Sequence, residues 1–127
     1  MKRILLVDND VDTREIYSTA LLHNGYAVLV AKDGGEGVRI AVEQVPDLIL
    51  MNLAMPRVDG LRATSILRDN PRTAAIPIIA CTGFAHDDGA EAAQDAGADS
   101  YLEKPVEPSR VVQEVERFIG PAVPAGG

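Results

Sequence analysis

The 127-residue chain is poor in several residue types, and each scarcity narrows the class of protein that it can encode. Its only cysteine, Cys81, excludes an internal disulfide and fits a reducing cytoplasm. Tryptophan is absent and aromatic residues make up 4% of the chain, so the core must be built from Leu, Ile, Val and Ala. No apolar run approaches the length of a membrane span, and no signal-peptide pattern opens the sequence. We therefore expect a cytoplasmic protein without a membrane anchor.

Basic residues are also scarce relative to acidic ones. Twelve Lys and Arg stand against nineteen Asp and Glu, which gives a formal net charge of −7. Direct binding to nucleic acid or to an anionic membrane needs a basic surface, so the composition argues against both. The whole chain, with 46% hydrophobic and 24% charged residues, has the composition of a globular protein. Its length allows one domain with one core.

Short apolar runs alternate with longer segments of helical period. The apolar runs predict strands at 3–7, 27–31, 47–51, 76–81 and 100–102. One helix is expected between each pair of strands and a fifth after the last, with helical segments at about 11–24, 37–45 and 108–119 and an Ala-rich, acidic segment with a poor apolar stripe at 87–96. This alternation predicts parallel strands joined by right-handed crossovers in one doubly wound α/β domain. We expect the domain to span residues 1–119, followed by a flexible tail at 120–127.

Polar residues stand where the predicted strands end. In an open parallel sheet, ligands bind beyond the carboxyl ends of the strands, so these residues are candidates for a site. Carboxylate, amide, hydroxyl and ammonium groups gathered at one edge suit a divalent cation and a phosphoryl group. In chain order the candidates are Asp8, Asn9 and Asp10, then Asn52, then Thr82 and Gly83, then Lys104 and Pro105.

Four segments, "ILLVDND", "PDLILMNLAMPRVDG", "PIIACTG" and "GADSYLEKP", together resemble the receiver domain of bacterial two-component response regulators. The resemblance covers residues 1 to about 119 and implies a flavodoxin-like fold, a five-stranded parallel sheet of order 2-1-3-4-5 flanked by five helices. The family's acidic pair falls on Asp8 and Asn9, its phosphorylated aspartate on Asn52, its hydroxyl on Thr82 and its lysine on Lys104.

The resemblance implies three further features of the site. A Mg²⁺ ion would be held by Asp8, Asn9, Asn52 and the backbone carbonyl of Ala54. Thr82 and Tyr101 would act as a switch pair, and the Lys104–Pro105 peptide bond would be cis, which an X-Pro bond adopts at modest cost.

Two positions depart from the family pattern. The family has a carboxylate at position 52 and usually another at position 9, whereas this chain has Asn52 and Asn9. An acyl phosphate cannot form on a carboxamide, and Mg²⁺ prefers carboxylate oxygens, so its binding should be weak. The sequence therefore predicts a non-enzymatic receiver that contacts a histidine kinase or a downstream target, as a monomer or weak homodimer. An otherwise active receiver with a substituted acceptor remains an alternative.

A second alternative is an enzyme. "ILLVDND" also resembles the opening of haloacid-dehalogenase-type phosphatases, with Asp8 as nucleophile and Asp10 as general acid. Asp12 stands where those enzymes have Thr or Val, and the chain leaves little room for a cap. We favour Asp10 as a helix N-cap and an ion pair between Lys104 and Asp8, while Asn9 can be a cap or a metal ligand.

Overall fold

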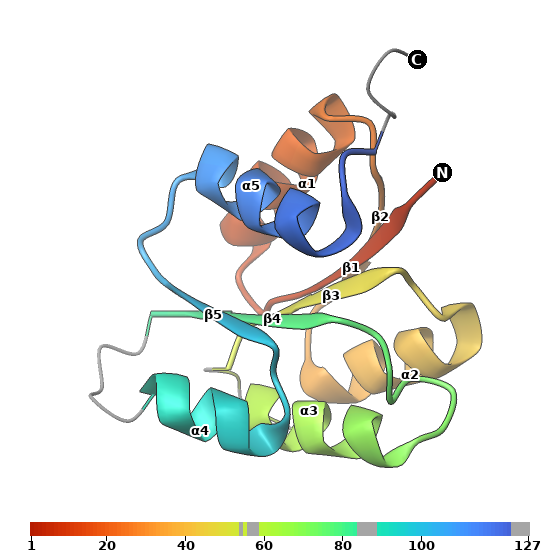
Figure 1. Cartoon of the computed structure of the whole chain (residues 1–127). Helices are drawn as coiled ribbons and strands as arrows, with labels where there is room; N and C mark the ends of the chain where they lie inside the picture. Colours follow the sequence, from red (N-terminus) through yellow and green to blue (C-terminus); the bar gives the residue numbers. More distant parts are fainter. Residues whose placement is uncertain (54, 56–58, 84–88, 123–127) are drawn as a thin grey trace.

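The computed structural model describes residues 1–53, 55, 59–83 and 89–122, without the side chain of Thr82. Five parallel strands form one sheet in the order β2-β1-β3-β4-β5, as predicted (Figure 1). The strands are β1 (Arg3–Val7), β2 (Ala27–Ala31), β3 (Leu48–Met51), β4 (Ile78–Thr82) and β5 (Ser100–Glu103). The helices are α1 (Val11–His23), α2 (Gly34–Gln44), α3 (Gly60–Asp69), α4 (Gly89–Ala96) and α5 (Pro108–Ile119).

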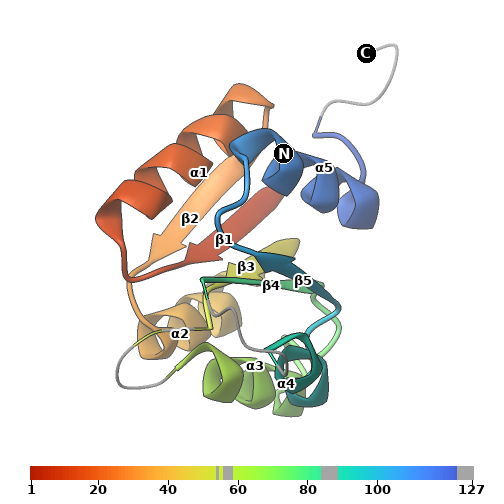
Figure 2. The same cartoon turned by 90° about the vertical axis from the view of Figure 1, so that its left-hand side faces the viewer.

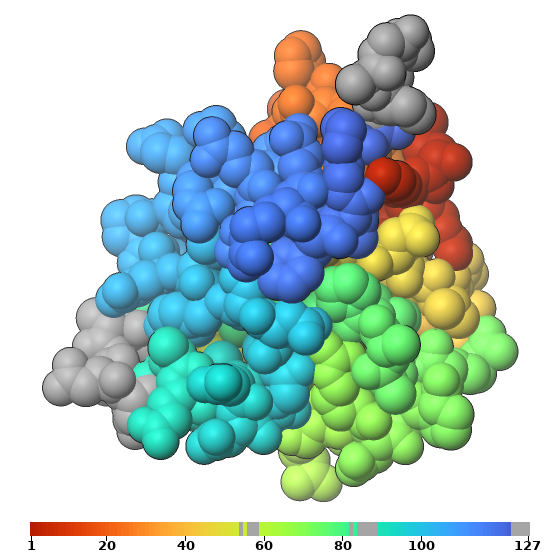
Figure 3. All heavy atoms as spheres, viewed as in Figure 1, coloured from red at the N-terminus to blue at the C-terminus, as the bar shows by residue number. Residues whose placement is uncertain are grey.

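Helices cover both faces of the sheet. Figures 1 and 2 show α1 and α5 on one face and α2, α3 and α4 on the other. Successive side chains of a strand point to opposite faces, so Ile4 and Leu6 of β1 pack in the cluster under α1 and α5, and Leu5 and Val7 in the cluster under α2 to α4. Burial on both faces explains why β3 is apolar at every position, and why β1 is apolar from Ile4 to Val7. In the space-filling view, β5 residues lie between α5 and α4 at the sheet's edge (Figure 3).

Three helices begin with an aspartate at the carboxyl edge of the sheet. The side chains of Asp10, Asp33 and Asp59 accept hydrogen bonds from backbone N–H groups in the first turns of α1, α2 and α3. The cap at Asp33 explains why α2 starts at Gly34, three residues before the predicted segment. Helix α4 begins at Gly89, and residues 87 and 88 of its predicted segment lie outside the described residues.

Basic side chains cap the other ends of the helices. Arg3 donates to the carbonyls of Gln44 and Val45 at the end of α2. Arg68 donates to the Gly97 carbonyl just after α4, at 2.8 Å, and Lys2 to the Ile119 carbonyl at the end of α5. Cations at helix C-termini are favourable because the helix dipole is negative there. Aspartates thus cap α1, α2 and α3 at the carboxyl edge of the sheet, and basic side chains bind carbonyls at the ends of α2, α4 and α5 at the amino edge.

The first residues after α5 are held by hydrogen bonds to the body of the domain. The Tyr26 hydroxyl donates to the Gly120 carbonyl at 2.7 Å, and Lys2 Nζ donates to the Pro121 carbonyl at 3.1 Å. Residues 123–127 of the predicted flexible tail lie outside the described residues. In the described part of the chain, no helix has the length and apolar character needed to cross a membrane.

A carboxylate is buried between α5 and β5. Glu114 is 4% exposed and lies on the same side of α5 as its buried valines. It accepts hydrogen bonds from Arg117 Nε at 2.7 Å and from the Ser100 hydroxyl at 2.6 Å, with Arg110 3.4 Å away. The Arg117 hydrogen bond, helped by Ser100 and opposed by burial, lowers the pKa of Glu114 to about 2. Ionised Glu114 therefore ties α5 to the edge strand.

We expect Glu114→Gln to lower the free energy of unfolding by about 2 kcal/mol at neutral pH, allowing for screening by the exposed arginines. The folded pKa lies below the ordinary value of 4.5, so the contribution is present above that value and disappears as pH falls towards 2. Urea denaturation across this range should show the parent and variant converging at low pH.

The control is Glu43→Gln, which removes the partner of Arg39 in an exposed pair on α2. Its effect at neutral pH should stay under about 0.5 kcal/mol. A constant difference between Glu114→Gln and the parent across the pH range would contradict the assignment of Glu114 as an ionised tie.

Candidate functional site

The site is centred on the carboxylate of Asp8, which directly follows β1. The backbone N–H of Asp8 donates to the Ala31 carbonyl at 3.0 Å, and its side chain is turned inward, leaving the residue 2% exposed. One carboxylate oxygen, Oδ2, accepts from Lys104 Nζ at 2.7 Å, and the other, Oδ1, from the Asp10 backbone N–H at 2.9 Å. The predicted ion pair is confirmed, and it leaves this buried carboxylate well supplied with donors.

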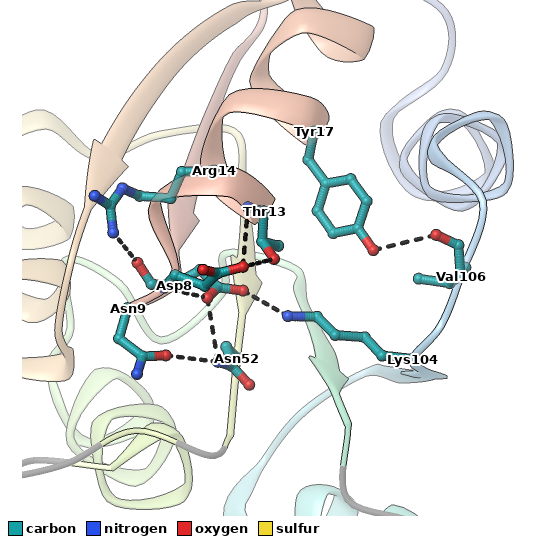
Figure 4. Close-up of polar contacts among 9 residues, drawn as sticks. Asp8, Asn9, Thr13, Arg14, Tyr17, Asn52, Lys104 and Val106 are labelled. Carbon is teal, nitrogen blue, oxygen red and sulfur yellow. Dashed lines mark hydrogen bonds and ion pairs between the residues drawn. The ribbon is translucent and has the colours of Figure 1, made fainter.

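Lys104 reaches Asp8 from the edge strand β5. It follows β5, whereas Asp8 follows β1, and the ends of β3 and β4 lie between the two. The Lys104 side chain is 19% exposed, and the Lys104–Pro105 bond is cis, as predicted. Figure 4 shows the Lys104 ammonium and the Asn52 amide approaching the Asp8 carboxylate from different directions.

Asn52 closes the cluster from the end of β3. Its backbone N–H donates to the Val7 carbonyl at 2.9 Å, which extends the pairing of β1 and β3, and the residue is 7% exposed. Its side-chain nitrogen lies 3.3 Å from Asp8 Oδ1 and 3.2 Å from Asn9 Oδ1. Ionised Asp8 can only accept hydrogen bonds, so the nitrogen of the amide must face it. Asn52 therefore acts here as a donor, through two long hydrogen bonds.

Gly60 holds the backbone of Asn52 in place, a role that the sequence analysis missed. A Cβ at position 60 would lie 2.1 Å from the Asn52 carbonyl oxygen and 2.5 Å from Leu53 Cα. The Gly60 N–H also donates to the Leu53 carbonyl at 3.3 Å. Only a glycine allows α3 to start this close to the end of β3.

The cap of α1 is Asp10, and not the neighbouring Asn9. Asp10 is the N-cap of α1 and accepts from the N–H and hydroxyl of Thr13 at 3.2 and 2.5 Å. These hydrogen bonds, that of the hydroxyl first, lower the pKa of Asp10. Asn9 is thus not the cap; its side-chain oxygen accepts from Asn52.

Arg14 adds a second cation that the sequence analysis did not consider. Its guanidinium donates to the Asp8 carbonyl at 2.7 Å and lies beside the Asp8–Asn9 turn (Figure 4). Lys104 and Arg14 thus offset the charges of Asp8 and Asp10. Within the described ranges, no three His, Cys, Asp or Glu side chains gather in a way that could hold a metal ion.

Three other residues are predicted for the site, and the structure describes the side chain of one of them, Tyr101. Thr82 is the last residue of β4, but its side chain, like the whole of Ala54, lies outside the described residues. Tyr101 is half-buried on β5, packs against the core under α2 to α4, and lines a cavity of about 240 Å³ together with Ala90 and Ala93 of α4.

A larger, mostly apolar cavity adjoins the ion pair. It has a volume of about 500 Å³ and lies between α1 and the loop that follows β5. Lys104 lines it, so an occupant would touch the partner of Asp8. The full lining is Thr13, Ile16, Tyr17, Gly83, Lys104, Pro105, Val106 and Pro108.

Known proteins share both the fold and the sequence pattern of this chain. The family model of the response regulator receiver domain matches residues 4–116. The polar-differentiation response regulator DivK of Brucella anthropi is 30% identical over 121 residues, which cover 95% of this chain and 98% of the relative.

Solved structures of receiver proteins have the same fold as this chain. The receiver domain of the sensor histidine kinase PA1611 from Pseudomonas aeruginosa, solved with a magnesium ion coordinated in its active site cleft, is 34% identical with a TM-score of 0.87. The match covers 94% of this chain and 98% of that one. Vibrio cholerae chemotaxis protein CheY4 is 26% identical with a TM-score of 0.87, and the match covers 93% and 98% of the two chains.

The chain belongs to the response regulator receiver domain family, whose members receive signals in two-component systems. These matches give the phosphatase alternative no support. The geometry also speaks against it, because the exposed carboxylate of Asp10 is engaged by Thr13 as a helix cap, where that alternative needs a general acid beside Asp8.

We expect Asn52→Asp to lower the free energy of unfolding of the metal-free protein by about 1 kcal/mol. The change replaces a donor 3.3 Å from Asp8 Oδ1 by a carboxylate oxygen, and like charges held this close are unfavourable. Denaturant melts in the presence of a chelator measure the effect.

The control for this substitution is Asn70→Asp. Asn70 accepts from the Arg72 N–H through its side-chain oxygen at 2.9 Å, a contact that a carboxylate can keep. An Asn52→Asp variant that is as stable as the parent would show that the Asn52 amide contributes nothing to the cluster.

Proposed function

We propose that this receiver domain signals through protein contacts without phosphorylation at position 52. The observation that supports the proposal is the direction of the Asn52 amide, whose nitrogen donates to both Asp8 and Asn9. Phosphorylation of a receiver requires a carboxylate oxygen that attacks phosphorus, and a carboxamide supplies neither that charge nor a stable acyl phosphate. With Asn52 as a donor, the site is organised by hydrogen bonds in place of a phosphoryl group.

We propose that Mg²⁺ binds only weakly. The PA1611 receiver holds a magnesium ion in its cleft, but the donor set fits the ion poorly here. Asp8 is already paired with Lys104, and Asn52 turns its nitrogen towards Asp8 and Asn9. Mg²⁺ needs oxygen ligands in near-octahedral geometry and prefers carboxylates. The carbonyl of Ala54 remains a proposed ligand.

In this proposal the switch residues keep one arrangement. Thr82 would have no phosphoryl oxygen to bind, and Tyr101 would receive no signal from it. Lys104 would remain on Asp8. The domain then acts as a non-enzymatic module, monomeric or weakly dimeric, with a fixed surface for its partner.

We propose that the partner, a histidine kinase or a downstream target, covers the apolar cavity between α1 and the loop after β5. Ile16 lines the cavity and is 53% exposed, and an exposed apolar side chain beside a mostly apolar cavity favours protein contact. The exposed acids Asp12, Glu15 and Glu107 stand nearby in the sequence, so a partner with a basic rim fits. Nucleic acid does not suit this acidic edge.

Incubation with acetyl phosphate and Mg²⁺, followed by intact-mass analysis, tests the proposal directly. The parent should gain no phosphoryl group, and Asn52→Asp should gain one in part of the molecules if Thr82 and Lys104 are correctly placed. Asn52→Asp combined with Lys104→Ala is the control and should label less. Labelling of the parent would contradict the proposal and favour an active receiver with another acceptor.

Thermodynamic coupling to Mg²⁺ tests the metal site separately. A cation that binds only the folded state stabilises it by mass action. Saturating Mg²⁺ should therefore raise the free energy of unfolding of Asn52→Asp by about 1 kcal/mol while barely changing that of the parent. Equal gains would mean that Asn9 and Asn52 still build a working metal site.

A further inference from the structure

Tyr17 connects α1 to the loop that carries Lys104. Its hydroxyl donates to the Val106 carbonyl at 3.2 Å (Figure 4), and the residue is only 7% exposed. Its ring packs in the core cluster that also contains Cys81 and Leu102, at the ends of β4 and β5. Burial, with Cys81 nearby, raises the pKa of Tyr17 to about 12, so the hydroxyl stays protonated at neutral pH.

Helix α1 and its cap contact Asp8 directly, and they contact the loop that carries Lys104. At its start, the N–H of its cap Asp10 donates to the Asp8 carboxylate, and Arg14 donates to the Asp8 carbonyl. Two turns into the helix, Tyr17 binds the carbonyl of Val106, two residues after Lys104. A flexible lysine side chain loses entropy when its ammonium is held in one place, so a fixed backbone favours the contact.

We propose that Tyr17 is a positioning residue whose hydroxyl fixes the loop after β5 and thereby holds the Lys104 ammonium on the Asp8 carboxylate. The same bond also shapes the apolar cavity, because Tyr17, Val106 and Lys104 all line it. A partner seated in this cavity and the ion pair are then mechanically linked. The inference is independent of whether position 52 is phosphorylated.

Tyr26 provides a matched control for Tyr17 at the amino edge of the sheet. Tyr26 is also buried, and its hydroxyl donates to the Gly120 carbonyl at 2.7 Å. Next to that contact, Lys2 Nζ donates to the carbonyls of Ile119 and Pro121. The Tyr17 hydroxyl thus binds the loop that carries Lys104, and the Tyr26 hydroxyl binds the residue between the two acceptors of Lys2.

The experiment compares Tyr17→Phe with Tyr26→Phe by NMR of the ¹⁵N-labelled lysine ammonium groups. Each change removes one hydroxyl and keeps the ring, so both variants should fold. Tyr17→Phe should speed solvent exchange of the Lys104 ammonium about fivefold, the factor expected for loss of one hydrogen bond, and leave that of Lys2 unchanged. Tyr26→Phe should do the reverse.

An effect of both variants on both lysines, or no effect of Tyr17→Phe on Lys104, would overturn the proposal, since a general loss of stability does not select one ammonium. A second measurement uses the unsubstituted protein. The Tyr17 hydroxyl proton should exchange slowly with water and show a nuclear Overhauser effect to Val106, and rapid exchange would also overturn the proposal.

Discussion

The buried carboxylate of Asp8 is the constraint around which the site is built. A charge with almost no access to water is tolerated only when donors surround it. Among the described residues, three donors converge on it: the Lys104 ammonium, the Asp10 backbone N–H and the Asn52 side-chain amide. They come from the ends of β5, β1 and β3, so the strand order places them together. The charge of Asp8 is thus met by one ammonium and by the hydrogen bonds of Asp10 and Asn52.

The direction of the helices places their N-termini at the edge of the sheet where Asp8 lies. Every crossover helix runs back against the strands, so helix N-termini lie at the carboxyl edge, where aspartates cap three of them. Arg3, Arg68 and Lys2 bind carbonyls at the opposite edge. At the carboxyl edge, Lys104 and Arg14 are the cations that bind Asp8, through its carboxylate and its backbone carbonyl respectively.

The sequence predicts the sheet, the Asp10 cap and the ion pair because each depends on a local pattern or on the ends of parallel strands. It does not predict contacts set by three-dimensional packing. The approach of Gly60 to Asn52 depends on where α3 begins in space, and the Tyr17–Val106 bond joins residues 89 apart. Glu114 shares a side with buried valines, and nothing in the periodicity shows that Ser100 and Arg117 partner it. The direction of the Asn52 amide likewise depends on the acceptor beside it.

A crystal structure of the unsubstituted protein grown with excess Mg²⁺, at a resolution that distinguishes amide nitrogen from oxygen, tests the central claim most directly. The claim is that Asn52 serves as a donor that replaces the cation. The account predicts that the Asn52 nitrogen still faces Asp8 and Asn9 and that Lys104 still contacts Asp8. A cation coordinated by the side-chain oxygens of Asn9 and Asn52, with the amide turned over, would contradict it.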